Sequence, residues 1–277
     1  MEWKQLIGAP TDDPLETLVS DGGYCGIFRT IACIGDSLAS GEFESLDAEG
    51  KKHYHDLYDY SWGQYLGRMC GSKVYNFSRG GMSAKWYCET FADEKGFWSP
   101  DLAAQAYIVA LGVNDLHNNE NIVAGREPIG SADEIDLSDW HNNPKNFAGY
   151  YATIIQRYRE IQPRAKFFLM TFPDHPRTGS EHFDVHRRVD REHRALLYAF
   201  AEKFPNTYVI DLFRYAPTYD EKFRETFFCG GHMNAMGYVF TARIVATYID
   251  WIIRRDPAAF REVGFIGTPY RYEQDAN

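Results

Sequence analysis

Apolar and polar positions follow one another along this chain in a pattern that predicts a parallel β-sheet covered by helices. Short, mostly apolar runs are typical of strands buried on both faces, and longer amphipathic segments between or after them are typical of helices with one buried face. The strand candidates are 30–34, 73–77, 106–111, 166–170 and 207–212, and the helix candidates lie around 60–70, 147–161, 184–203 and 234–254. This βα alternation predicts the α/β class with helices on both sides of the sheet.

Length and composition are compatible with one large core. The chain has 277 residues, 44% of them hydrophobic, and we interpret residues 1–277 as a single domain. Residues up to about 28 form an N-terminal extension ahead of the first strand candidate. The polar segment 117–145 is longer than an ordinary βα connection, which is typical either of a lid that borders a substrate or of a disordered loop.

The net charge excludes some classes of binding partner, and the cysteine content predicts the cellular compartment. The formal net charge of -10 argues against nucleic acid and anionic membranes, because both are bound through excess Lys and Arg. No apolar run is long enough to cross a bilayer, and the N-terminus does not resemble a secretory signal. The five cysteines include no CxxC pair and predict free thiols in a reducing cytoplasm: Cys25, Cys33, Cys70, Cys88 and Cys229.

Unusual polar loops follow the first three strand candidates, where ligands bind in open α/β sheets. They read "GDSLASG", "SRGGMSA" and "GVNDLHNN". Ser37 comes immediately after the first strand, where helix-start amides could face a developing negative charge. Taken alone, the tripeptide "GDS" is more simply explained if Asp36 or Ser37 caps a helix.

The other two loops supply further hydrogen-bond donors. The Gly81 amide and the Asn114 side chain follow the next two strands and could point at the same atom as Ser37. Two or three donors that converge on one oxygen form an oxyanion hole. Individually, Gly81 is better explained as a turn glycine, and Asn114 as a loop residue that bonds its own backbone.

Together these blocks resemble the SGNH, or GDSL-type, hydrolase family. The similarity spans roughly residues 30–255 and rests on Ser37 in "GDS", Gly81 in "NFSRGG", Asn114 in "GVND" and His232 in "GGHMNAMGY". The resemblance implies a flavodoxin-like, three-layer α/β/α fold and hydrolysis of esters, thioesters or carbohydrate-borne acyl groups without a metal or cofactor. It also implies Ser37 as nucleophile, His232 as general base, and an oxyanion hole made by the amides of Ser37 and Gly81 and the Asn114 side chain.

The chain departs from the family at the residue expected to orient His232. The family usually has an Asp three positions before the His, but this chain has Cys229, and a thiol is a weak partner for an imidazole. Three explanations stay open: a Ser–His dyad held by a backbone carbonyl, a carboxylate recruited from elsewhere, or loss of catalysis. The carboxylates nearest in sequence are Asp220, Glu221 and Glu225.

Other signals favour simpler interpretations. The histidines His175, His182, His186 and His193 lie close in sequence, but the segment lacks the HExxH order and its charged neighbours indicate a solvated helix, so no metal site is predicted. Cys229 as a nucleophile would leave the other blocks unexplained. Aromatic residues near the active-edge loops are candidates for stacking on a sugar: Trp62, Trp86, Tyr87, Trp98 and Trp140.

The sequence therefore predicts a cofactor-independent serine esterase that works through an acyl-enzyme. Its predicted partner is a small-molecule acyl ester, with a short acyl group on a carbohydrate or similar polar alcohol as the favoured substrate. A lysophospholipase or acyl-thioesterase on the same fold is the first alternative. The second is a catalytically impaired homologue that binds carbohydrate. The pattern predicts no particular oligomeric state.

Overall fold

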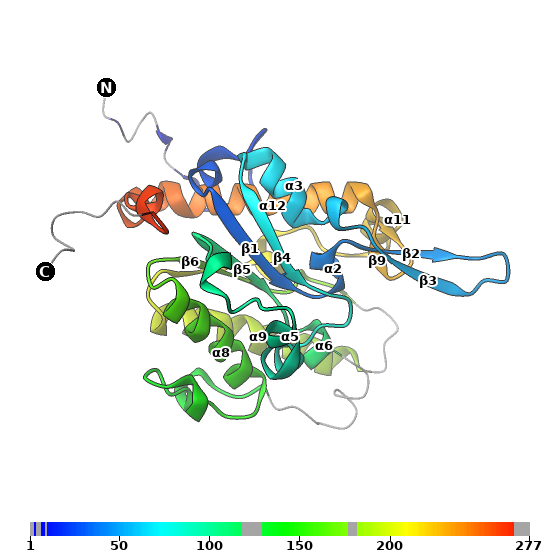
Figure 1. Ribbon diagram of the computed structural model, residues 1–277. Helices are drawn as coiled ribbons and strands as arrows, with labels where there is room; N and C mark the ends of the chain where they lie inside the picture. The colour runs from blue at the N-terminus through cyan, green and yellow to red at the C-terminus, as the bar shows by residue number, and fades with distance from the viewer. Residues whose placement is uncertain (1–2, 4–6, 9, 118–128, 177–181, 269–277) are drawn as a thin grey trace, which may run out of the picture.

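The central sheet consists of the strands that the apolar pattern predicts. A computed structural model describes residues 3, 7–8, 10–117, 129–176 and 182–268 (Figure 1). Five parallel strands lie in the order β4-β1-β5-β6-β7. Their bounds are β1 Thr30–Gly35, β4 Lys73–Ser78, β5 Ala106–Ala110, β6 Lys166–Met170 and β7 Thr207–Ile210. The predicted α/β class with a parallel sheet is confirmed.

Helices cover both faces of this sheet and make the predicted three layers. In Figure 1, α3 (Trp62–Cys70) and α12 (Ala235–Arg255) lie above the sheet, and α8 (Phe147–Ile161) and α9 (Phe183–Lys203) lie below it. Alternate residues of β1 enter the two cores, since Ile31 packs with the α3 and α12 side and Ala32 with the α8 and α9 side. Strands buried on both faces have no polar face, which explains their continuous apolar runs.

The strand order fixes where a ligand site belongs. β1 lies between β4 and β5, so the chain leaves β1 toward one neighbour and returns on its other side. Such a reversal opens a crevice at the carboxyl ends of the strands, and ligands of open α/β sheets bind there. Residues that follow β1, β4 and β5 are therefore brought to one edge.

Shorter elements decorate that edge and the connections. Two antiparallel pairs accompany the main sheet: β2 (Glu42–Leu46) with β3 (Lys52–Asp56), and β8 (Phe228–Cys229) with β9 (His232–Met233). The β2–β3 hairpin projects beyond the strand ends, with β9 and α2 at its base (Figure 1). The short α-helices are α2 Ser37–Ser40, α4 Ala84–Trp86, α5 Ala92–Glu94, α6 Val113–Leu116, α10 Leu212–Tyr215 and α11 Glu221–Phe227. The 3-10 segments are Gly23–Ile27, Tyr58–Tyr60, Pro100–Leu102, Ala132–Glu134, Trp140–Asn142, Pro257–Phe260 and Val263–Phe265, and Tyr87–Phe91 is a π-helical turn.

The described part of the N-terminal extension packs along α12. The Val19 amide donates to Thr247 Oγ1 at 3.0 Å, and the Tyr24 amide donates to Asp250 Oδ1 at 2.8 Å. Both contacts attach the extension to α12. Among the described residues, no helix is both long and apolar enough to span a membrane.

Candidate active site

Ser37 lies at the first turn of α2, directly after β1. The Asp36 side chain caps this turn by accepting the Leu38 amide at 3.0 Å. Gly35 allows α2 to fold back onto β1, because a Cβ there would lie 2.4 Å from the Ala39 Cβ. Ser37 itself is half-buried. The sequence thus places a hydroxyl and the start of a short helix at the strand edge, while Asp36 has the capping role that the simpler interpretation gave it.

Gly81 and Asn114 lie on loops that the structure ties together. Asn114 Nδ2 donates to the Met82 carbonyl at 3.0 Å, so the side chain of one candidate bonds the residue next to the other. Gly81 has φ +72 with open space around its α-carbon, a conformation that glycine adopts without strain. Asp115 reinforces the link because both of its carboxylate oxygens lie 3.0 Å from the Ala84 amide. The two predicted donors therefore belong to one connected structure.

Two buried carboxyl groups underlie these loops. Burial raises the pKa of Asp36 to about 6 and that of Asp115 to about 7, against the lowering effect of the backbone amides that each accepts. Desolvation disfavours the charged carboxylate, which explains the direction of both shifts. The loops that carry Ser37 and Asn114 are thus anchored by groups that titrate near neutral pH.

His232 is held on β9, within a tight hairpin between α11 and α12. Asn234, two residues on, caps α12 by accepting the Gly237 amide at 3.0 Å, and its amide group donates to the Thr226 carbonyl at 2.9 Å. The imidazole is 15% exposed. Its Nε2 lies 3.0 Å from Glu42 Oε1, and its Nδ1 lies 3.5 Å from Glu44 Oε2. Both carboxylates come from β2, far away in the sequence.

The carboxylates expected near His232 lie elsewhere. The Asp220 side chain caps α11 by accepting the Phe223 amide, and Glu221 and Glu225 are exposed on that helix. None of the three pairs with His232, so these candidates were wrong. Sequence reasoning missed Glu42 and Glu44, although "EFESL" and "KHYHD" around the turn "DAEG" have the alternation of a hairpin. Residues two apart on a strand share a face, which is why both reach one imidazole.

Cys229 lies opposite His232 rather than one helical turn before it. The two residues are paired across the β8–β9 hairpin, with Gly230 and Gly231 forming the turn. The thiol is free and the residue is exposed. Because directly paired residues of antiparallel strands point to the same face, position 229 still offers a side chain beside the imidazole.

Ser37 and His232 are neighbours without a direct bond in this structure. Helix α2 packs against both β2 and β9, but within the described chain the Ser37 hydroxyl makes no hydrogen bond with either ring nitrogen, which face Glu42 and Glu44. Catalytic hydrogen bonds are often long before substrate binds. A bonded Ser–His pair does occur at exposed positions of the hairpin, where Ser45 Oγ lies 2.8 Å from His55 Nε2, away from the strand-end donors.

A small apolar pocket lies beside these residues. It has a volume of about 70 Å³ and is bounded by Asp36 and Leu38, which flank Ser37, and by Met233, which follows His232. The remaining lining residues come from α2, α3, the end of β5, α6, β6 and the loop after it, α10, the loop before α11, and α12: Ala39, Trp62, Ala110, Val113, Met170, Thr171, Phe172, Pro173, Leu212, Tyr219 and Thr241. The lining is mostly apolar and suits a compact hydrocarbon group.

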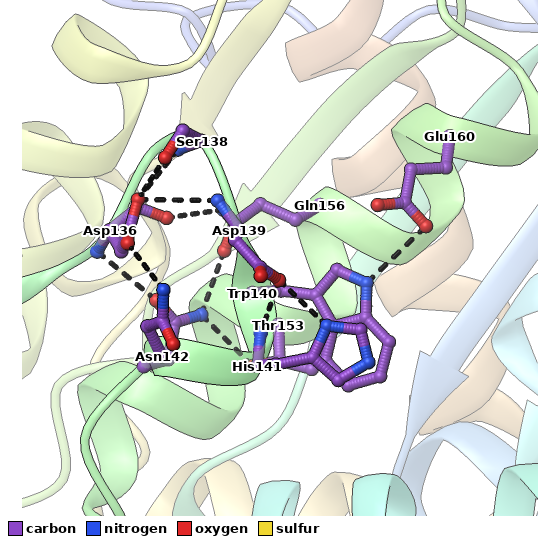
Figure 2. A network of polar contacts seen from close by, with 10 residues as sticks. Asp136, Ser138, Asp139, Trp140, His141, Asn142, Thr153, Gln156 and Glu160 are labelled. Atoms are coloured by element: carbon purple, nitrogen blue, oxygen red, sulfur yellow. Dashed lines mark hydrogen bonds and ion pairs between the residues drawn. The ribbon is translucent and has the colours of Figure 1, made fainter.

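The described part of the 117–145 segment packs on α8 rather than over this pocket. Residues 118–128 lie outside the described part of the chain, so the lid hypothesis concerns them alone. Asp136 organises the remainder by accepting from Ser138, Asp139 and Asn142, and Trp140 Nε1 donates to Glu160 of α8 at 3.3 Å (Figure 2). This network stabilises the connection.

The five aromatic residues predicted to stack on a sugar differ in their exposure. Trp62 and Tyr87 are buried in the core, and Arg157 of α8 lies over the rings of Trp98 and Trp140. Trp86 alone among the five is exposed on α4, next to the Gly81 loop, where the Arg79 guanidinium lies 5.1 Å from its ring. A further exposed ring, that of Tyr54 on β3, meets His232 edge to face at 5.7 Å.

The histidine-rich helix is not solvated on its inner face. His186, Asp190 and His193 of α9 are buried, so the expectation of a solvated helix was wrong for this side. His117 Nε2 lies 2.7 Å from Asp190 Oδ1, and its Nδ1 lies 2.9 Å from His186 Nδ1. Within the described ranges, no group of three or more His, Cys, Asp or Glu residues is arranged to hold a metal ion.

Comparisons with known proteins concern the family and the fold of this chain. The sequence profile of the GDSL-like Lipase/Acylhydrolase family matches residues 33–240. No curated protein sequence gave a significant match. One similar solved structure is a carbohydrate acetylesterase, Est24, from Sinorhizobium meliloti, with 14% identity, a TM-score of 0.52, and coverage of 81% of this chain and 99% of that one.

Two further structures are larger than this chain. A family two carbohydrate esterase from Clostridium thermocellum, an active-site mutant, has 15% identity and a TM-score of 0.52, and the match covers 83% of this chain and 64% of that one. A carbohydrate esterase family 2 enzyme with a carbohydrate binding domain, from Corynascus thermopiles, has 17% identity and a TM-score of 0.52, with 80% and 65% covered. At these identities the likeness establishes the shared fold.

Proposed function

The chain belongs to the GDSL-like lipase/acylhydrolase family and is an ester-hydrolysing serine hydrolase, and we propose that it removes a short acyl group from a polar alcohol without a metal ion. Ser37 is the nucleophile and His232 the general base in this proposal. The observation that carries it is the convergence of the three strand-end loops, with the side chain of Asn114 bonded to the loop that holds Gly81.

The proposed reaction proceeds in two steps. His232 accepts the Ser37 proton as the hydroxyl oxygen attacks the ester carbonyl, and the negative oxygen is stabilised by the amides of Ser37 and Gly81 and by Asn114 Nδ2. The protonated imidazole then gives its proton to the departing alcohol. Water, deprotonated by His232, attacks the acyl-enzyme and releases the acid and free Ser37.

The size of the pocket supports a short acyl group. Since one water molecule needs about 10–15 Å³ measured this way, the 70 Å³ beside Ser37 suits a compact acyl group such as acetyl rather than a long chain. A lysophospholipase would need an extended apolar groove, and none is evident in the lining that the described residues provide. A preference for short or long acyl chains therefore distinguishes a short-chain esterase from a lysophospholipase.

A carbohydrate alcohol is the favoured leaving group. Similar structures include enzymes described as carbohydrate esterases. Two aromatic rings are exposed on elements near the candidate residues: Tyr54 contacts His232, and Trp86 lies on α4, which follows the Gly81 loop. Aromatic faces pack well on the apolar faces of sugars.

We also propose that one domain carries the activity and that the protein works in the cytoplasm, in keeping with five free thiols.

Hydrolysis of p-nitrophenyl acetate, butyrate and octanoate tests this proposal. We expect acetate to be the best substrate, and we expect Ser37→Ala and His232→Ala each to reduce kcat by about 10³-fold or more. Ser45→Ala is the matched control because it removes the hydroxyl of the exposed Ser–His pair. Equal rates for wild type and Ser37→Ala would refute the nucleophile, and a preference for octanoate would favour the lysophospholipase.

The sugar preference needs its own measurement. We expect Trp86→Ala to raise KM for an acetylated xylo-oligosaccharide while leaving KM for p-nitrophenyl acetate within about twofold, since a lost stacking contact affects only the sugar. Trp140→Ala, which removes a ring that packs against Arg157 of α8, is the control. Equal KM values for the sugar ester in wild type and Trp86→Ala would remove the stacking role.

A further inference from the structure

The His232 imidazole lies between two carboxylates of one strand. Glu42 approaches Nε2 at 3.0 Å, and Glu44 approaches Nδ1 at 3.5 Å. A catalytic imidazole uses one nitrogen for the nucleophile and needs an acceptor at the other. The two carboxylates therefore cannot have the same role, and their surroundings distinguish them.

Glu42 lies on the side of the imidazole that faces the catalytic loops. Its Oε2 rests directly against Gly80, where an added Cβ would lie 2.1 Å away. Gly80 precedes Gly81, the proposed oxyanion donor. Burial raises the pKa of Glu42, against the lowering effect of His232. Nε2 thus faces the edge where the acyl group and Ser37 belong, which leaves Nδ1 for an orienting group.

Glu44 lies on the opposite side and is fixed there. Its side chain is 5% exposed, and its Oε1 pairs with Lys52 Nζ at 2.7 Å. Its Oε2, the atom nearest His232 Nδ1, also accepts the Gly231 amide at 3.0 Å. Lys52 and that amide hold the pKa of Glu44 below its usual range. Because Gly231 is bonded directly to His232, this contact fixes the carboxylate relative to the histidine backbone.

We propose that Glu44 is the positioning residue for His232, in the role that the family's motif assigns to the side chain at position 229. This inference rests on the proposed function, which makes His232 the base. A carboxylate at Nδ1 favours the tautomer that leaves Nε2 free to accept a proton, and it stabilises the imidazolium formed when Ser37 attacks. Within the described residues His232 Nδ1 makes no hydrogen bond, and Glu44 is the carboxylate nearest to it at 3.5 Å, so the proposal requires this contact to shorten when substrate displaces Glu42 from Nε2.

The first experiment compares the two carboxylates. We expect Glu44→Gln to reduce kcat for p-nitrophenyl acetate by about 10²- to 10⁴-fold with a much smaller change in KM, the size of effect found when the acidic member of a serine triad is removed. Glu42→Gln, on the same strand and at the same ring, should reduce kcat by less than Glu44→Gln does. Glu49→Gln at the exposed hairpin tip is the control. The reverse ranking of Glu42 and Glu44 would overturn the proposal.

A carboxylate restored at position 229 supplies a second test. Cys229 pairs with His232 across the hairpin, so Cys229→Asp offers an acceptor from the usual place. We expect it to recover about tenfold or more of the kcat lost in Glu44→Gln, and to change the wild-type rate less than threefold, because one acceptor suffices. A large gain in the wild-type background would mean that Glu44 does not hold the imidazole.

Nitrogen chemical shifts of the His232 ring give a readout that does not require turnover. Because Glu42 lies 3.0 Å from Nε2 in this structure, the measurement is made in a Glu42→Ala background, where we expect Nδ1 to carry the proton at neutral pH. When Glu44→Gln is added to this background, the side-chain amide can donate to Nδ1, so the proton should move to Nε2. Unchanged shifts would refute the role of Glu44. An inactive wild type with Glu44-dependent shifts would instead refute the proposed function alone.

Thermal unfolding of each variant separates positioning from folding. Glu44 is an ion-pair partner, so Glu44→Gln could lower Tm and thereby the rate. Lys52→Met provides the comparison, because it removes the ion pair while the Gly231 amide still holds Glu44. We expect it to lower Tm as much as Glu44→Gln does while keeping most of kcat. An equal loss of kcat in both variants would mean that hairpin integrity, rather than the carboxylate at Nδ1, controls the rate.

Discussion

Gly35→Ala should displace Ser37, the proposed nucleophile, without changing that residue itself. Gly35 ends β1, and a Cβ at this position would lie 2.4 Å from the Ala39 Cβ and 3.2 Å from the Ala110 carbonyl oxygen. Both neighbours are short and rigid, and no flexible side chain can swing away. Because carbon atoms in contact are about 3.5–4.0 Å apart, α2 has to shift by roughly 1 Å or more away from β1, and Ser37 at its first turn shifts with it.

We expect Gly35→Ala to lower both the free energy of unfolding and kcat. Overpacking a tight site typically destabilises by about 1–3 kcal/mol, which lowers the urea midpoint but leaves the protein folded. A misplacement of about 1 Å at the reacting group can reduce the rate about 100-fold. We therefore expect kcat for p-nitrophenyl acetate to fall about 100-fold under conditions where the variant remains folded by circular dichroism.

Two other glycines provide matched controls. An added Cβ at Gly264 meets nothing within 4 Å, so Gly264→Ala should change neither quantity. At Gly67 it would lie 2.8 Å from Val74 Cγ2, within α3 and away from Ser37, so Gly67→Ala should lower the urea midpoint without a comparable loss of kcat. A stable Gly35→Ala variant with kcat within threefold of wild type would refute the reasoning, as would equal kcat losses in Gly35→Ala and Gly67→Ala.

Three further variants test the loops and the buried titratable groups. Asn114→Ala should lower kcat by about 10²- to 10³-fold with little change in KM, as expected for an oxyanion donor, and a loss under threefold would remove it from that role. Burial raises the pKa of Asp115 to about 7, so its folded-state value exceeds the unfolded one and its contribution to stability is lost as pH rises from about 4 through 7. Urea unfolding between pH 5 and 8 should show a flatter pH dependence for Asp115→Asn than for wild type, and parallel curves would contradict this. Burial, aided by His117, lowers the pKa of His193 to about 3, so its contribution is lost as pH falls below about 6.5, and His193→Leu should flatten the acid side of the same curve.

The contact of Glu42 with His232 has a consequence for substrate binding. A carboxylate at Nε2 occupies the side from which Ser37 would be deprotonated in the proposed reaction, so that reaction requires Glu42 to move away from Nε2. Glu42 lies at the start of the projecting hairpin, and Tyr54 on β3, the cross-strand partner of Glu44, has an exposed ring that meets His232 edge to face. A sugar that packs on the Tyr54 ring and displaces Glu42 would free His232 Nε2 to act as the base. Recognition of the alcohol would then be coupled to catalysis in the proposed mechanism.

Much of this protein followed from local patterns in the sequence. Apolar runs specified the strands of the sheet, since strands buried on both faces need apolar side chains throughout. The three polar loops after the first three of these strands had to meet at one edge, because the carboxyl ends of parallel strands do so. The positions of Ser37, Gly81 and Asn114 at that edge were therefore predictable without coordinates. The four-block spacing also identified the family.

Only the tertiary structure showed which groups surround His232. The three carboxylates nearest in sequence lie on α11 or cap it, and they do not pair with His232. Glu44 does lie at the ring, although 187 positions separate it from Gly231. Local sequence determines which strands and helices form, because backbone geometry depends on neighbouring residues. The contact between β2 and β9 depends instead on how a hairpin docks beside α2, which is set by long-range packing that no local pattern encodes.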